Sequence, residues 1–192
     1  MAKEIDKIIG LLLGIIALVL IAITFFVNLA TITDKVSYLG LSYTSTTNTT
    51  FFGSSTGGHF SSWSNLTNGM TGSELAKATS GVDMIYASMA TMILAAIFVI
   101  LGIMTAFGKG PGMVKKFSVL FPIISAIFII MTIVLYYEGA STILSSFSLP
   151  SYVTTTISLA VGAYLAIGAL ILEFLIVIFN FLGFGKAKVS KN

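Results

Sequence analysis

The 192-residue chain contains no cysteine and only one histidine, His59. Without cysteine it can form no disulfide, no thiolate metal site and no cysteine nucleophile. A single histidine excludes bis-histidine haem ligation. No Ser-His-Asp catalytic triad can be identified either, because the sequence pattern places no nucleophilic serine near His59. We therefore predict that the protein is not an enzyme and binds no cofactor or metal. Polar segments of this chain must be held by packing, by glycans or by neighbouring chains.

Charged residues are also scarce, at 9 % of the chain against roughly 25 % in an ordinary soluble domain. Hydrophobic residues make up 56 %, and the mean hydropathy is +1.03. So few charges cannot solvate a globule of this size, so lipid has to cover much of the surface. The basic residues are all lysine and form no basic patch of the kind that nucleic-acid binding requires. We expect an integral membrane protein with no nucleic-acid partner.

Four apolar runs predict four transmembrane helices. About 20 apolar residues in a helix rise about 30 Å, the thickness of the hydrocarbon core. The first run is longer than a signal-peptide core and lacks a small-x-small cleavage site, which favours a retained span. The predicted spans are residues 8–29, 84–107, 117–137 and 153–182, within one membrane domain covering 1–192. Between and after them lie an outer loop (30–83), an inner loop (108–116), a second outer loop (138–152) and an inner tail (183–192).

The distribution of lysine predicts the orientation of these spans. The two predicted outer loops carry only Lys35 and Lys77. The N-terminus, the inner loop and the tail carry Lys3, Lys7, Lys109, Lys115, Lys116, Lys186, Lys188 and Lys191. The positive-inside rule therefore places both termini in the cytoplasm and the large loop outside a cell membrane. Two sequons, at Asn48 and Asn65, are glycosylation candidates on that outer face, although such sequons also arise by chance in Ser/Thr/Asn-rich segments.

The large outer loop has β character. Residues 36–43 alternate in part between apolar or aromatic and small polar residues, 59–63 contain Phe60 and Trp63, and Gly and Ser/Thr/Asn runs separate the two segments, which predicts a small antiparallel sheet. Thr71-Gly-Ser-Glu74 matches a capping box for a short helix over 73–80, which either ends at Gly81 or continues into the second span. The candidates for an outer interaction surface are the large apolar side chains Phe51, Phe52, Phe60 and Trp63.

Small residues within the predicted spans indicate helix packing, because close approach of backbones stabilises helix pairs in lipid. These small residues recur every three, four or seven positions and so form stripes along the helices. The stripes favour a compact four-helix bundle rather than a pore, since none is continuously polar. The packing candidates are Gly10, Gly14, Gly162, Ala166 and Ala169. The polar residues expected inside the membrane are Asn28, Ser125, Glu173 and Asn180.

Glu173 is the most informative single residue. It lies ten residues before Gly183, hence about 15 Å into the membrane, where burial favours the neutral acid. We expect Ser125, at a matching depth, to be its hydrogen-bond partner. Three interpretations stay open: a clamp between helices or subunits, a proton or cation relay, or a helix end nearer water.

The layout of spans and loops resembles that of the claudin and peripheral-myelin-protein type of tetraspan membrane proteins. The resemblance includes Trp63 late in the large loop and the helical approach over Ser73–Gly81. Claudins carry a G-L-W motif followed by two cysteines, whereas here Ser61-Ser62-Trp63 is followed by none. The resemblance implies a small outer β-sheet on a left-handed four-helix bundle, with lateral or cell–cell assembly through the outer loops.

The sequence thus predicts an all-α membrane protein, a four-transmembrane-helix bundle with a small β-rich outer loop domain. We expect a non-enzymatic structural, adhesion or envelope-organising role, with membrane lipids and copies of itself or other surface proteins as partners. An accessory subunit of a larger respiratory or transport complex is the alternative. A small transporter or channel that uses Glu173 is a third hypothesis.

Overall fold

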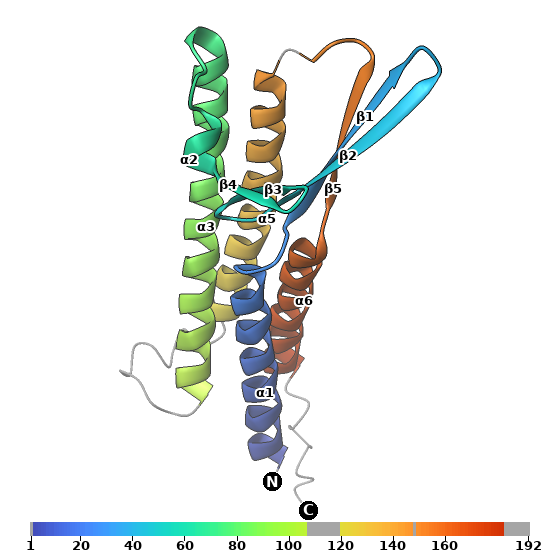
Figure 1. Cartoon of the computed structure of the whole chain (residues 1–192). Helices are drawn as coiled ribbons and strands as arrows, with labels where there is room; N and C mark the ends of the chain where they lie inside the picture. Colours follow the sequence, from blue (N-terminus) through green and yellow to red (C-terminus); the bar gives the residue numbers. More distant parts are fainter. Residues whose placement is uncertain (1, 107–119, 148, 183–192) are drawn as a thin grey trace, which may run out of the picture. The chain divides into compact units, whose positions relative to one another are not determined.

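The computed structural model describes residues 2–106, 120–147 and 149–182 (Figure 1). The chain divides into two compact units. We call Met1–Ala22, Thr91–Ile130 and Ala166–Asn192 the helical unit, and Ile23–Ala90 with Met131–Leu165 the sheet unit. The helices are α1 (Ala2–Thr24), α2 (Trp63–Leu66), α3 (Gly72–Ala106), α5 (Leu120–Ser146) and α6 (Val161–Leu182). The strands are β1 (Ala30–Tyr38), β2 (Leu41–Thr49), β3 (Gly53–Thr56), β4 (His59–Ser62) and β5 (Val153–Leu159).

In the helical unit, parts of α1, α3, α5 and α6 pack through small residues. A Cβ added at Gly14 of α1 would lie 3.0 Å from Ile103 Cγ1 of α3. Ala166 and Ala169 of α6 are fully buried. These contacts fit the predicted packing stripes. At Gly10 the described residues leave open space around the position of a Cβ, so close packing there stays a prediction.

Within the described residues, three helices are long and apolar enough to cross a membrane: Gly72–Thr105, Leu120–Ser146 and Val161–Phe179. The apolar part of α1, Ile8–Thr24, is shorter, and α1 ends at Thr24 rather than at the predicted residue 29. The structure thus supports a mostly helical, membrane-embedded protein with three spans by length and composition.

The sheet unit holds a five-stranded antiparallel sheet in the order β4-β3-β2-β1-β5 (Figure 1). The prediction of a small antiparallel sheet is confirmed. β1 lies between β2 and β5, so that Ala30 pairs with Thr49 on one side and with Leu159 on the other. Segments far apart in the sequence, one before α3 and one after α5, therefore form one sheet.

Strand β5 corrects the predicted start of the last span. Residues 153–159 were predicted to be helical but form a strand, and α6 begins at Val161. The reason lies in Val153-Thr-Thr-Thr-Ile-Ser-Leu159, which is rich in β-branched residues, and its backbone pairs with that of β1. The burial of its side chains alternates along the strand, which is the period-2 pattern of a half-covered sheet.

Two helices extend beyond the predicted spans, and α3 follows the second of the two alternatives left open at Gly81. α3 is one continuous helix from Gly72, and α5 continues through the predicted loop to Ser146. Gly81 does not end a helix: a Cβ there would lie 2.6 Å from the carbonyl oxygen of Gly139, and one at Gly139 would lie 2.7 Å from that of Gly81. The two glycines allow α3 and α5 to touch. The predicted inner loop (108–116), the first residues of the third span (117–119) and the tail (183–192) lie outside the described residues.

Candidate interaction surface

The base of the sheet is held by an aromatic cluster, which we call the aromatic anchor: Phe25, Phe51, Trp63 and Tyr136. The Phe51 ring is fully buried, with its centroid 5.2 Å from that of Phe25 and 5.7 Å, edge-on, from that of Tyr136. The carbonyl oxygen of Thr50 accepts hydrogen bonds from Trp63 Nε1 at 3.0 Å and from the Tyr136 hydroxyl at 3.1 Å. Packing and these two hydrogen bonds therefore fasten the sheet to α2 and α5 in a chain without cysteine.

The aromatic anchor corrects part of the predicted interaction surface. Phe51 and Trp63 are core residues, at 0 % and 2 % exposure. Phe52 and Phe60 are exposed, as predicted. An aromatic residue in a polar loop can serve as core or as contact surface, and a small sheet without disulfides needs aromatic core.

Gly162 and Asn28 lie where the strands of the sheet meet the ends of α1 and α6. The amide of Gly162 donates to the carbonyl oxygen of Asn28 at 2.7 Å, and the amide of Ala160 donates to that of Leu29 at 3.0 Å. A Cβ at Gly162 would lie 2.8 Å from the Asn28 oxygen. Gly162 is thus a close-packing residue, as predicted, although its partner is a backbone segment beyond α1. Asn28 was predicted to lie within a span, but it follows the end of that helix.

The three long strands give the sheet two different faces. Register and the alternation of side chains assign each residue to a face. One face is wholly polar, with Thr31, Thr33, Lys35 and Ser37 on β1, Ser42, Thr44, Thr46 and Asn48 on β2, and Thr154, Thr156 and Ser158 on β5. The other face is largely apolar and includes Ile32, Val36 and Tyr38 on β1. This apolar face is buried at Ile32 and exposed at Tyr38.

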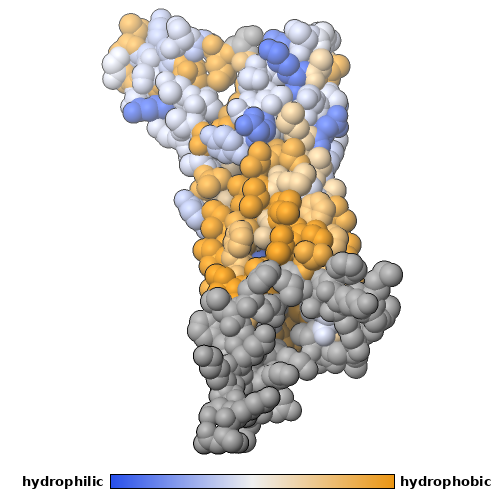
Figure 2. Space-filling model, turned by 180° about the vertical axis from the view of Figure 1, so that it is seen from behind, coloured by the Kyte–Doolittle hydropathy of each residue, from blue (hydrophilic) through white to orange (hydrophobic). Residues whose placement is uncertain are grey.

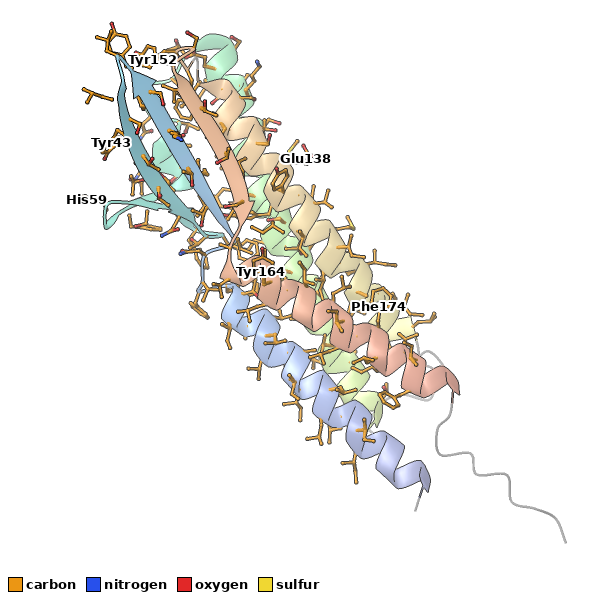
Figure 3. All side chains as sticks on the ribbon, turned by 90° about the vertical axis from the view of Figure 1, so that its right-hand side faces the viewer. Tyr43, His59, Glu138, Tyr152, Tyr164 and Phe174 are labelled. Atoms are coloured by element: carbon orange, nitrogen blue, oxygen red, sulfur yellow. The ribbon has the colours of Figure 1, made fainter. Side chains whose placement is uncertain are left out.

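At the far end of the β1–β2 hairpin the exposed side chains form a cluster that we call the apolar tip: Tyr38, Leu39, Leu41, Tyr43 and Tyr152. Leu39 and Leu41 are 84 % and 80 % exposed. The Tyr152 ring lies 5.5 Å from that of Tyr38, and its carbonyl oxygen accepts a 3.0 Å hydrogen bond from the Ser37 amide. Tyr43 and Tyr152 lie towards the same end of the sheet in Figure 3. Figure 2 shows hydrophobic colour at this hairpin end beside paler polar surface.

The turn in the apolar tip is unusual in its sequence. Tyr38 pairs with Leu41, so Leu39 and Gly40 form a two-residue turn, with φ of 50° and 81°. Gly57 and Gly58, which join β3 to β4, have φ of 57° and 84°. Two positive φ values are typical of a type I′ turn, which favours Asn-Gly or Gly-Gly. A leucine in this conformation is sterically disfavoured. The pattern over 36–43 predicts a strand and not this turn, since Leu-Gly is not a usual turn signal.

The two candidate glycosylation sites differ in accessibility. Asn48 lies within β2, is half-buried, and its Oδ1 accepts a 3.3 Å hydrogen bond from the Thr31 hydroxyl. Asn65 lies in α2 and is exposed. His59 is exposed on the β3–β4 hairpin (Figure 3). Glycosylation stays a prediction at both sites, and the geometry favours Asn65 over Asn48.

Glu173 is buried in the helical unit, at 1 % exposure. Its Oε1 has no hydrogen-bond partner among the described residues. The Ser125 hydroxyl instead donates to the carbonyl oxygen of Ala95 at 3.2 Å, so the predicted Ser125–Glu173 bond is wrong: the serine satisfies the backbone of α3. Asn180 lies in α6, and its side chain is outside the described part of the structure.

The described residues contain no group of three or more His, Cys, Asp or Glu side chains that could hold a metal ion. No protein-family model matches the chain, and no curated protein matches it in sequence. The apolar tip and the aromatic anchor that supports it are therefore the features from which a function can be argued.

Proposed function

We propose that this protein is a non-enzymatic tetraspan membrane protein that binds a neighbouring surface through its sheet unit, in a structural, adhesion or envelope-organising role. Both termini lie in the cytoplasm, and the sheet is extracellular. The observation that carries this proposal is the apolar tip, an exposed hydrophobic cluster at the end of a sheet whose base is firmly packed. Exposed apolar clusters rimmed by polar residues mark interaction sites.

The fourth span in this proposal is α1. Its 23 residues rise about 35 Å in total, although its apolar part, Ile8–Thr24, is shorter than the other three apolar helices. The segment after α1 is hydrogen-bonded to the start of α6 through Asn28 and Gly162. If α6 enters lipid at that point, the end of α1 lies at the same level. Successive loops then lie on opposite sides of the membrane. The lysine distribution sets which side is cytoplasmic, by the positive-inside rule.

The strand lengths support an adhesive role for the sheet. β1 and β2 each contain nine residues, which span about 30 Å at about 3.3 Å per residue. The apolar tip therefore lies about this distance from Ala30 and Thr49 at the base. A hairpin of this length presents its end to a neighbouring surface. Lateral self-association in the membrane would gather several such tips.

Topology can be tested separately from adhesion because the chain has no native cysteine. A membrane-impermeant maleimide applied to intact cells should label a Thr46→Cys variant. It should label a Gly110→Cys variant only after the cells are permeabilised. Labelling of residue 110 alone on intact cells would show that the topology is inverted and would overturn the proposal.

Adhesion is tested by mixing two differently labelled populations of cells that express the protein. We expect mixed aggregates with the wild type, and their loss with the double variant Leu39→Asn/Leu41→Ser. Leu75→Ser is the matched control, because Leu75 is an exposed leucine on α3 of the same unit. If wild-type cells do not aggregate, or if the control variant loses aggregation equally, the role of the tip is contradicted.

An accessory subunit of a larger membrane complex is the second candidate, and Glu173 favours it. The buried Oε1 of Glu173 has no hydrogen-bond partner among the described residues, and a buried polar group left without a partner indicates a function beyond the packing of this chain. Extraction in mild detergent, followed by native mass measurement, separates the two functions. Complexes of like chains support the first, and a stoichiometric set of unlike subunits supports the second. Proton or cation flux into liposomes that is lost in Glu173→Gln would instead support transport.

A further inference from the structure

The order of residues along the β1–β2 hairpin matches the layers of a membrane interface. Leu39 and Leu41 stand at the end, Tyr38 and Tyr43 follow, and Lys35 lies four residues below Leu39, about 13 Å along the strand. Leucine favours hydrocarbon, tyrosine favours the interfacial layer, and lysine pairs with anionic head groups. Between Lys35 and Glu74 the sequence has no charged residue. Asp34, next to Lys35 but on the opposite face, accepts a hydrogen bond from the Thr155 hydroxyl. The tip itself therefore carries no charge that opposes its burial in lipid.

The turn shows that the leucine at the end is not required by the fold. The β3–β4 turn reaches similar φ values with Gly-Gly, which strains no side chain. The β1–β2 turn places Leu39 in the same disfavoured region, with its side chain 84 % exposed. Burial of the Leu39 side chain therefore does not offset this strain, which indicates a function outside the chain.

From this arrangement we propose that the apolar tip inserts into the lipid of an apposed anionic membrane, with Lys35 on its head groups. The five side chains of the tip can offer roughly 600 Å², since an aromatic side chain buries about 150–250 Å² when fully covered. A stable protein–protein interface needs about 800 Å² from each partner. The tip is thus too small to hold a folded partner by itself, but insertion of a few apolar side chains to 5–10 Å suffices for interfacial binding to lipid. The inference rests on the proposed function, because only a displayed sheet can reach another membrane.

The first test measures, with a fluorescent dye, how deep the β1–β2 hairpin enters the lipid of a vesicle. Full-length protein in phosphatidylcholine nanodiscs would carry an environment-sensitive fluorophore at a single introduced cysteine, Ser42→Cys or Thr46→Cys. Both positions lie on the polar face of β2, and residue 46 is about 13 Å nearer the base. On addition of protein-free vesicles of phosphatidylglycerol and phosphatidylcholine, emission from residue 42 should rise and shift to the blue, while residue 46 stays unchanged. No response at 42, or an equal response at 46, would overturn the insertion.

The second test measures vesicle binding by co-flotation of the same nanodiscs. We expect Leu39→Asn/Leu41→Ser to weaken binding at least about tenfold, since two exposed leucines lose their transfer into hydrocarbon. Lys35→Gln should weaken binding about fivefold on anionic vesicles and leave binding to phosphatidylcholine unchanged. Leu75→Ser is the matched control. An equal loss in the control would overturn the assignment to the tip.

The outcomes separate this inference from the proposed function. A dye response only to vesicles that carry the protein would identify a second copy as the occupant, so adhesion would stand and lipid insertion would fall. Binding to protein-free vesicles without cell aggregation would support insertion and contradict the adhesive role. Absence of both would refute both.

Discussion

The base and the tip of the sheet contain similar residues but place them in opposite environments. At the base, Phe51 and Trp63 are buried and the Thr50 carbonyl oxygen accepts two side-chain hydrogen bonds. At the tip, Leu39 and Leu41 are almost fully exposed. The comparison shows that aromatic and aliphatic residues in one polar loop have two separate roles. The base residues hold the sheet, and the tip residues are available to a partner.

The largest effect is expected at the base. Phe51→Ala should lower the free energy of unfolding of the sheet unit by about 3–5 kcal/mol, because a fully buried ring is lost and leaves a cavity. The neighbouring Phe52 is about half exposed, so Phe52→Ala should change that free energy by about 0.5 kcal/mol or less. The fluorescence of Trp63, the only tryptophan, reports unfolding in detergent. Equal effects of the two variants would remove the distinction between base and tip.

A smaller effect is expected from the hydrogen bonds of the aromatic anchor. Tyr136→Phe keeps the ring packing but removes one of the two donors to the Thr50 carbonyl oxygen, and should cost about 1 kcal/mol. Tyr137 is exposed on the same helix, which makes Tyr137→Phe the matched control, with no measurable change. Thermal unfolding followed by Trp63 fluorescence gives both values. A neutral Tyr136→Phe would show that packing alone fastens the base.

The sequence predicted the membrane character, the sheet and several packing residues because these follow from composition and local pattern. Hydropathy identifies α3, α5 and α6, and β-branched runs bounded by glycine predict strands. Gly14 and Gly162 were predicted from the small-residue rule, which depends only on residue size.

The errors came from contacts between distant segments. β5 becomes a strand because β1 pairs with it, and a long apolar run hid its alternation. Gly81 was ambiguous until its contact with Gly139 showed that the helix continues. Phe51 was taken as a surface residue because nothing local distinguishes a buried aromatic from an exposed one. The same limit hid the apolar tip, since a leucine at positive φ breaks the turn rule by which a hairpin is found.

An effect of similar size but opposite sign is expected at Leu39, and it tests the comparison most directly. Leu39→Asn should raise the free energy of unfolding by about 1 kcal/mol, because asparagine tolerates positive φ and Asn-Gly is a preferred type I′ pair. Leu41→Asn, at an ordinary strand position of the same hairpin, should not stabilise. The same Leu39→Asn variant should bind vesicles less well, so stability and binding would change in opposite directions. Chemical denaturation and co-flotation on one preparation measure both. A variant that loses stability, or that gains it while binding fully, would show that Leu39 serves the fold rather than a partner.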